Sequence, residues 1–261
     1  MPRLLDLTAR RALLGAVGVL VLATVALQIS YPLTDGDAAQ RRLTIVTVLT
    51  FAAASAGHAR ARYGGRGVWC CAAAAGIGFT AEIVGVRTGV PFGHYAYADS
   101  LGSTIAGVPA VVALAWAMMA WPAALVARLL LAPTATRVLV GTWALASWDL
   151  FLDPQMVAAG HWRWAAPSPH LPGVETVPLT DLAGWLVVSL LISLVVQGIL
   201  GRSASRPGDG WMFAIYLWTY ASSVVALLLF LDLQAAALWG ALGMGAVAVP
   251  LAMRLRLEAV R

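Results

Sequence analysis

Residues 108–127 read VPAVVALAWAMMAWPAALVA and contain no charged side chain. A helix needs about 20 residues to cross the hydrocarbon core of a bilayer, so this stretch predicts a transmembrane helix. Similar runs recur along a chain that is 61% hydrophobic and 11% charged, with a mean hydropathy of +0.82. The expected segments are Ala12–Ile29, Leu43–Ala59, Val68–Val86, Val108–Ala127, Val138–Leu152, Leu182–Leu200, Trp211–Leu231 and Ala235–Met253. The sequence therefore predicts a single-domain, all-α, polytopic membrane bundle of about eight helices over residues 1–261.

The basic residues, all of them arginine, predict the orientation of this bundle. If the N-terminus is cytoplasmic, only Arg41, Arg42, Arg87 and Arg163 of the 17 arginines fall outside. Such a bias follows the positive-inside rule and places both termini in the cytoplasm of a multi-pass cell-membrane protein. Topology and attraction to anionic lipid account for the pI of about 9.8, so a nucleic-acid partner is not needed.

The cysteines and histidines show no metal-binding pattern. Cys70 and Cys71 are adjacent, so they cannot readily pair with each other and offer no zinc-ligand spacing. Membrane metalloenzymes need histidines that are clustered in the sequence. His58, His94, His161 and His170 are not clustered. The sequence predicts no metal site.

Two polar and aromatic phrases stand out from this apolar background. Residues 93–97 read GHYAY and residues 160–164 read GHWRW, each a glycine, a histidine and two aromatics separated by one residue. A carboxylate stands eleven residues before each phrase, Glu82 before the first and Asp149 before the second. Both phrases fall in long loops on the side predicted to be outside.

The likeness between the two regions continues downstream. Each phrase is followed by a Val-Pro pair that opens the next helix, at 108–109 and at 177–178, and proline favours a helix start. Residues 68–127 and 138–200 are therefore a candidate parallel repeat, an arrangement that often places a site between the repeats. Chance agreement in an aromatic-rich chain remains the alternative.

Four acidic residues near the outer helix ends are candidates for function. A charged group at membrane depth costs about 2.5–3.5 kcal/mol, so it usually faces a partner or a wet cavity. Asp149 and Asp153 share one helix face through their i,i+4 spacing. Helix capping is the favoured interpretation for Asp153 and Asp181. For Glu82 and Asp149 a functional role is the favoured interpretation, and a buried structural hydrogen bond is the alternative.

The residues of the two phrases have a structural and a functional interpretation. Aromatic belts are common at membrane interfaces, yet aromatics paired twice with a histidine and a carboxylate also suit the walls of a pocket. A histidine can bind a carboxylate or carry protons, and an arginine can pair with a carboxylate or extend to the interface. The candidate substrate-binding residues are Tyr95, Tyr97, His94, Trp148, His161, Trp162 and Trp164, with Arg163 as a further candidate.

These motifs resemble those of the CruF-type carotenoid 1,2-hydratases, a family of carotenoid biosynthesis membrane proteins. The resemblance is carried by TGVPFGHYAY at 88–97, GVPAVVALAWAMMAWP at 107–122 and DLFLDPQMVAAGHWRW at 149–164. It implies a cofactor-independent enzyme that adds water to the terminal C1=C2 bond of an acyclic carotenoid and gives a tertiary alcohol. The implied partners are such a carotenoid (lycopene-, gamma-carotene- or bisanhydrobacterioruberin-like), membrane lipid and, for assembly, further copies of the chain.

The carboxylates and aromatics suit this chemistry. Hydration needs an acid to protonate C2, stabilisation of the cation at C1, and a base for the attacking water. Burial and a carboxylate neighbour keep a carboxyl protonated, so Asp149 is the expected acid, with Asp153 or Glu82 as its partner and base. Aromatic faces can stabilise the cation.

Two other functions remain open from the sequence. The DLFLD motif is a DxxxD that could bind magnesium in an intramembrane prenyltransferase, although such enzymes normally need a second aspartate-rich motif and basic residues. A proton-coupled carrier could use Glu82 and Asp149 as a relay. Magnesium dependence distinguishes the first alternative, and substrate flux without chemical change distinguishes the second.

Overall fold

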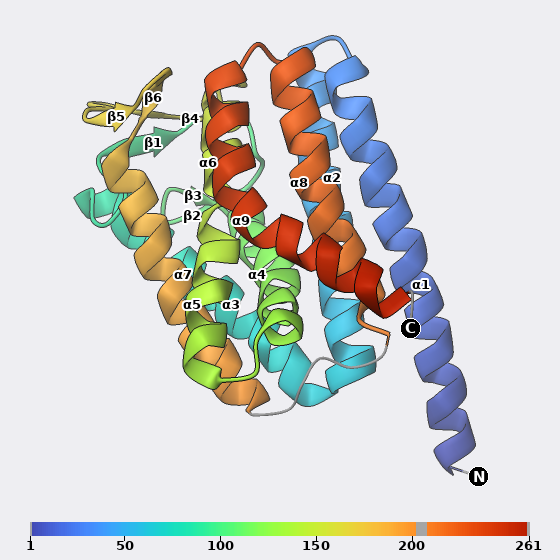
Figure 1. The fold of residues 1–261 in the computed structure, drawn as a ribbon. Helices are drawn as coiled ribbons and strands as arrows, with labels where there is room; N and C mark the ends of the chain where they lie inside the picture. The colour runs from blue at the N-terminus through green and yellow to red at the C-terminus, as the bar shows by residue number, and fades with distance from the viewer. Residues whose placement is uncertain (1, 202–207, 260–261) are drawn as a thin grey trace.

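A computed structural model describes residues 2–201 and 208–259 of the chain. Helices dominate it, in the order α1 (Pro2–Ser30), α2 (Asp37–Tyr63), α3 (Gly65–Thr88), α4 (Ala110–Leu130), α5 (Thr134–Ala146), α6 (Asp149–Ala158), α7 (Leu179–Leu200), α8 (Gly210–Leu229) and α9 (Gln234–Ala259). A short 3-10 helix, η1 (Tyr31–Leu33), joins α1 to α2. The helices form one bundle (Figure 1), which confirms the all-α fold.

Six of the helices are long and apolar enough to cross a membrane, namely α1, α3, α4, α7, α8 and α9. The chain is therefore a multi-pass membrane protein. The remaining expected segments, in α2 and in the α5–α6 pair, pack against these spans but do not belong to that set. The described part of the chain thus contains fewer clear spans than the eight segments expected from sequence.

The fifth expected segment, Val138–Leu152, is divided between α5 and α6. The Trp148 N–H donates to the Leu145 carbonyl at 3.3 Å, an i→i−3 bond, where a continuous α-helix would have an i→i−4 bond. A tightened turn of this kind interrupts the regular ladder. As a result Asp149 is the first residue of α6, whereas we expected it inside a helix.

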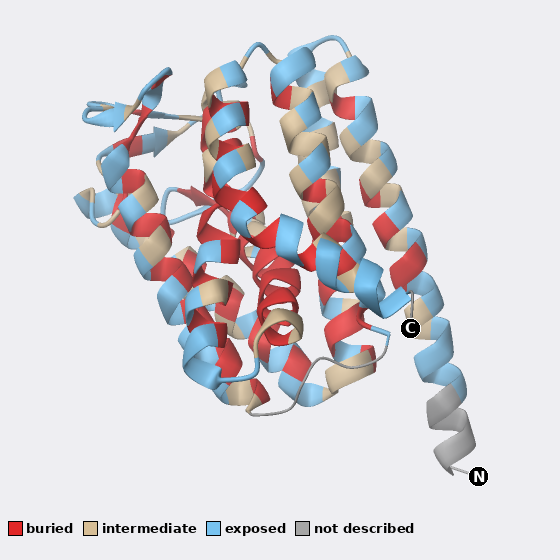
Figure 2. Cartoon of the chain, in the orientation of Figure 1, coloured by how far each residue is buried: buried red, intermediate tan, exposed pale blue. Residues whose placement is uncertain are grey.

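The core lies around α4, whose side chains are mostly buried along its length (Figure 2). Helices α2, α3, α5, α7 and α8 all pack against it. Cys70 and Cys71 are free and buried in α3, as expected of core residues. Glycine at position 78 lets α3 lie close to α4, because a Cβ there would clash with the Trp116 ring.

Short strands lie at the end of the bundle opposite the N-terminus (Figure 1). They are β1 (Tyr95–Tyr97), β2 (Thr104–Ile105), β3 (Val108–Pro109), β4 (Trp162–Trp164), β5 (His170–Leu171) and β6 (Val174–Pro178). They form antiparallel pairs β1–β4, β2–β3 and β5–β6. The pair β1–β4 joins the α3–α4 loop to the α6–α7 loop, and so brings the two phrases together.

Candidate active site

The two phrases pair with each other symmetrically. In the β1–β4 ladder Tyr95 faces Trp164 and Tyr97 faces Trp162, so the third position of each phrase meets the fifth position of the other. Flanking bonds repeat the pattern: Ala98 N–H donates to the His161 carbonyl at 2.8 Å, and Ala165 N–H donates to the His94 carbonyl at 2.9 Å. The ladder is thus centred on a local pseudo-twofold axis.

Glycine begins each phrase because the chain there has a positive φ, +88° at Gly93 and +71° at Gly160. Side-chain residues rarely adopt this conformation. It turns the backbone from the preceding helix region into the strand, which fixes where the aromatics that follow will point.

Alternation along the strands places the phrase aromatics on one face of the ladder. Tyr95, Tyr97, Trp162 and Trp164 all line a cavity. Their rings lie close across the ladder, with centroid distances of 5.6 Å for Tyr95–Trp164 and 5.5 Å for Tyr97–Trp162. The opposite face carries Ala96 and Arg163, which are exposed.

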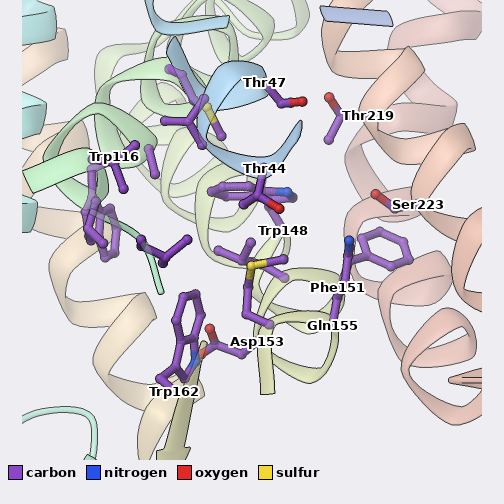
Figure 3. Close-up of a pocket in the computed structure, with 18 of the residues that line it drawn as sticks. Thr44, Thr47, Trp116, Trp148, Phe151, Asp153, Gln155, Trp162, Thr219 and Ser223 are labelled. Carbon is purple, nitrogen blue, oxygen red and sulfur yellow. The ribbon is translucent and has the colours of Figure 1, made fainter. Parts of the chain in front are cut away.

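The cavity holds about 170 Å³ and extends from this aromatic face between α2, α4, α6 and α8. Glu82, Asp153 and Asp181 line it, together with Trp148. Asp149 does not line it and instead borders a smaller neighbouring cavity. In Figure 3 the Asp153 carboxyl lies beside the Trp162 ring at one end of the space.

Glu82 is buried and surrounded by hydrogen-bond donors. Tyr95 and Tyr97 donate to Oε2 at 2.5 and 2.8 Å, and Trp116 Nε1 donates to Oε1 at 3.1 Å. Burial, and then the neighbouring carboxylate, raises the pKa of both phenols above its usual range, so both keep their O–H. Three donors suit an ionised carboxylate, which accepts only, and they leave lone-pair capacity on Oε1.

The aspartates form a different kind of site. Asp149, Asp153 and Asp181 are buried, and each contributes a carboxyl oxygen that lies within 4.8 Å of the others. Their side chains are within hydrogen-bonding reach of one another, and a carboxyl can bond to another carboxyl only if a proton lies between them. Among the described residues no arginine or histidine forms an ion pair with this cluster.

Asp153 is the member of the cluster that meets both the cavity and the aromatics. The side chains of Trp162 and Trp185 lie within hydrogen-bonding reach of it. The capping interpretation of Asp153 is wrong, because this residue lies in the middle of α6. Asp181 is in the first turn of α7, but the cap position there is Pro178, so its interpretation as a cap is also wrong.

Carboxylate oxygens are ligands that magnesium binds in proteins, so this cluster could hold a metal ion, although the sequence predicted no metal site. This cluster is the one group of metal-ligating side chains found among residues 2–201 and 208–259. No arginine lines the cavity formed by those residues. The site therefore offers acidic ligands but no basic partner for a phosphate group.

Sequence reasoning missed Trp116 and Trp185. Their rings stack with centroids 4.0 Å apart and planes at 24°, and both line the cavity. Each stands seven residues after the proline of a Val-Pro pair, Pro109 or Pro178, a spacing that could have revealed them.

The histidines and Arg163 are not brought to the cavity. His94 is exposed, and His161 is buried with Nδ1 2.8 Å from the Ser100 hydroxyl. Burial lowers the pKa of His161, so this ring is neutral and holds the loop before β2. Arg163 is exposed and forms no ion pair with the carboxylates in the described part of the chain.

The fold and the site together define a class of protein: helical membrane proteins that hold buried carboxyls along an aromatic cavity. The family of carotenoid biosynthesis proteins matches residues 42–250, so the chain belongs to that family. A bisanhydrobacterioruberin hydratase of Haloarcula japonica is 36% identical over 130 residues, which are 48% of this chain and 43% of that protein. The matched part is less than half of the length of that relative. No solved structure gives a significant match.

Proposed function

We propose that this protein is a carotenoid 1,2-hydratase, which adds water to the terminal C1=C2 bond of an acyclic carotenoid and forms a tertiary alcohol. One observation carries the proposal: a single aromatic cavity is lined by Glu82, which accepts three hydrogen bonds, and by Asp153 and Asp181, which belong to a cluster of three buried carboxyls. The family and the hydratase named among its relatives support it.

Asp153 is the acid in this proposal. Sequence reasoning favoured Asp149, but Asp153 is the member of the α6 pair that lines the cavity. Its proton passes to C2 of the alkene, and the C1=C2 electron pair forms the new C–H bond. Asp149 and Asp181 are positioning residues that keep a proton on the cluster.

The cavity aromatics stabilise the cation that this step leaves at C1. A buried carboxyl is a weak acid towards an alkene, so stabilisation of the cation has to be strong. An aromatic face contributes about 2 kcal/mol or more when water is excluded. Tyr95, Tyr97, Trp148, Trp162 and Trp164 line the same space as Asp153.

Glu82 is the base for the attacking water. Water forms the C1–O bond and its proton passes to the free lone pair of Oε1, so the sum of both steps is addition of one water. The donors Tyr95, Tyr97 and Trp116 favour the charged form of Glu82 that this step needs. Transfer of this proton from Glu82 to Asp153 then restores both groups and completes the cycle.

The size of the cavity suits the end of a polyene. A cavity of roughly 150 Å³ accepts a ligand as large as benzene, so about 170 Å³ matches an end group and not a whole carotenoid. The rest of the polyene then lies in the roughly 30 Å hydrocarbon core, with the reacting tip at the outer face of the cell membrane. No cofactor takes part in these steps.

Co-expression with an acyclic carotenoid pathway tests the proposal. We expect pigments heavier by one water per modified end, measured by liquid chromatography and mass spectrometry. Asp153→Asn provides the matched inactive control at equal membrane levels. Unchanged pigments across several acyclic substrates would contradict hydratase activity.

A magnesium-dependent prenyltransferase is the second candidate, because Asp149, Asp153 and Asp181 form a carboxylate cluster. The lack of arginine in the cavity lining of the described residues argues against a bound diphosphate. The hydratase proposal predicts full activity in excess EDTA. An activity that EDTA abolishes and magnesium restores would favour the prenyltransferase.

A further inference from the structure

The cavity has a polar wall that the steps above do not use. It lies across the space from Trp162 and Trp116, where Thr47 and Thr219 face each other and Ser223 and Gln155 point inward (Figure 3). The polar residues of this wall are Gln28, Thr44, Thr47, Gln155, Thr219, Ser222 and Ser223.

Three of these side chains, those of Thr47, Thr219 and Ser223, do not serve mainly to join helices. In membrane bundles hydroxyl and amide groups commonly bond across helix interfaces. The Thr219 hydroxyl instead donates to the Ile215 carbonyl of its own helix at 2.8 Å. Neither Thr47 nor Ser223 makes a side-chain hydrogen bond to another residue within the described ranges.

The wall offers both hydrogen-bond donors and hydrogen-bond acceptors to a molecule in the cavity. A threonine hydroxyl that donates to its own backbone keeps lone pairs that can accept, as at Thr219. Gln28 Oε1 accepts from Trp218 Nε1 at 2.8 Å, and its amide N–H groups remain as donors. A hydrocarbon end group can satisfy none of these groups.

We propose that this wall binds and delivers the water consumed in the reaction, an inference that rests on the hydratase function. Water both donates and accepts, so it matches both kinds of group on the wall. A single hydroxyl on a substrate would bond to one or two of the polar side chains on this wall. Several water molecules in a row could bond to all of them.

The wall leads towards the outer end of the bundle. Tyr31 and Pro32 of η1, the connection between α1 and α2, line the same cavity, and the Tyr31 phenol lies within hydrogen-bonding reach of Thr44 and Gln155. Water entering beside η1 meets Thr44 first, and Thr47 and Thr219 extend the polar wall along α2 and α8.

The test separates protonation of the alkene from capture of water. In D₂O, protonation and its reversal put deuterium into recovered alkene, whereas capture gives alcohol. Thr47→Val, Thr219→Val and Ser223→Ala are each expected to lower alcohol formation about three- to tenfold, the loss expected for one neutral hydrogen bond. Deuterium in the recovered alkene should stay at or above the wild-type level.

Thr50→Val is the matched control, because Thr50 is on the same helix as Thr47 but bonds to its own backbone and to Thr24, outside the cavity lining. Equal alcohol formation by all wall variants and the wild type would overturn the water path. Loss confined to substrates that already carry a hydroxyl would overturn it too and would assign the wall to substrate recognition. If the wild type forms no alcohol, the hydratase function itself fails.

Discussion

The Glu82 site and the aspartate cluster lie in the two halves of the candidate repeat, a frame that the β1–β4 ladder joins, yet they differ in what surrounds the carboxyl. Glu82 accepts from two tyrosines and a tryptophan. Asp153 has tryptophans in matching places but also has Asp149 and Asp181 beside it. Donors stabilise a charged carboxylate, whereas carboxyl neighbours require shared protons. The frame can thus hold a base and an acid at the same cavity.

The symmetry of the frame extends from the strands into the helices. Trp116 and Trp185 occupy equivalent places and stack on each other. Deeper in the bundle, Arg128 and Gln197, each 19 residues after its Val-Pro proline, form a hydrogen bond of 2.7 Å. These contacts support our proposal that residues 68–127 and 138–200 are a parallel repeat with the site between its halves.

The largest expected effect is that of Asp153→Asn, which removes the proposed acid. We expect alcohol formation and deuterium exchange into the alkene to fall together by about 10²- to 10⁴-fold, the usual contribution of a general acid. Both reactions need the first proton transfer. Asp99→Asn, an exposed aspartate in the first motif loop, is the control. Exchange that survives in Asp153→Asn would remove this residue as the acid.

Glu82→Gln removes the proposed base and should affect alcohol formation and deuterium exchange to different extents. Alcohol formation is expected to fall about 10²-fold, because the attacking water loses its base. Deuterium exchange into the alkene should fall less, since Asp153 still protonates C2. Equal loss of both reactions would mean that the two halves do not divide acid and base roles.

Asp149→Asn sharpens the distinction within the cluster. Asp149 does not line the main cavity, so we expect a loss of about ten- to a hundredfold, as for a hydrogen bond that involves a charged group. Complete inactivation would return the acid role to Asp149, as the sequence first suggested.

The sequence predicted the parts of this site better than their roles. Hydropathy predicted the bundle, and the repeated phrase favoured a pocket shared by Tyr95, Tyr97, Trp162 and Trp164. All four line one cavity, and their role in binding a substrate stays a prediction. Strand pairing between the phrases could not be inferred, because it depends on how α3 and α7 pack. The turn at Ser147 and Trp148 was equally hidden, and it decides which aspartate faces the cavity.

A smaller effect compares the stacked tryptophans. Trp116→Phe removes a donor from Glu82, and Trp185→Phe removes one from Asp153; each should lower alcohol formation about three- to tenfold. Trp116→Phe should spare deuterium exchange, whereas Trp185→Phe should alter exchange and alcohol formation together. Rates are compared with Trp211→Phe, a partly exposed tryptophan away from the cavity.

The smallest effect concerns the histidines at the second position of each phrase, where the symmetry fails. His161 is 1% exposed and contacts Ser100, whereas His94 is exposed. His161→Asn should destabilise the protein by about 1 kcal/mol at neutral pH, the value of one hydrogen bond, or roughly 2–4 °C in thermal midpoint. His94→Asn should leave the midpoint unchanged.

The pH dependence of the midpoint completes this comparison. Burial lowers the pKa of folded His161 below the unfolded value of about 6.5, so the unfolded chain binds more protons as pH falls through that window. Stability must then decrease with falling pH below about 6.5. Part of this decrease should disappear in His161→Asn and persist in His94→Asn, measured by the thermal midpoint in detergent between pH 7.5 and 5.5. Identical pH profiles for the two variants would show that His161 does not titrate differently from an exposed histidine.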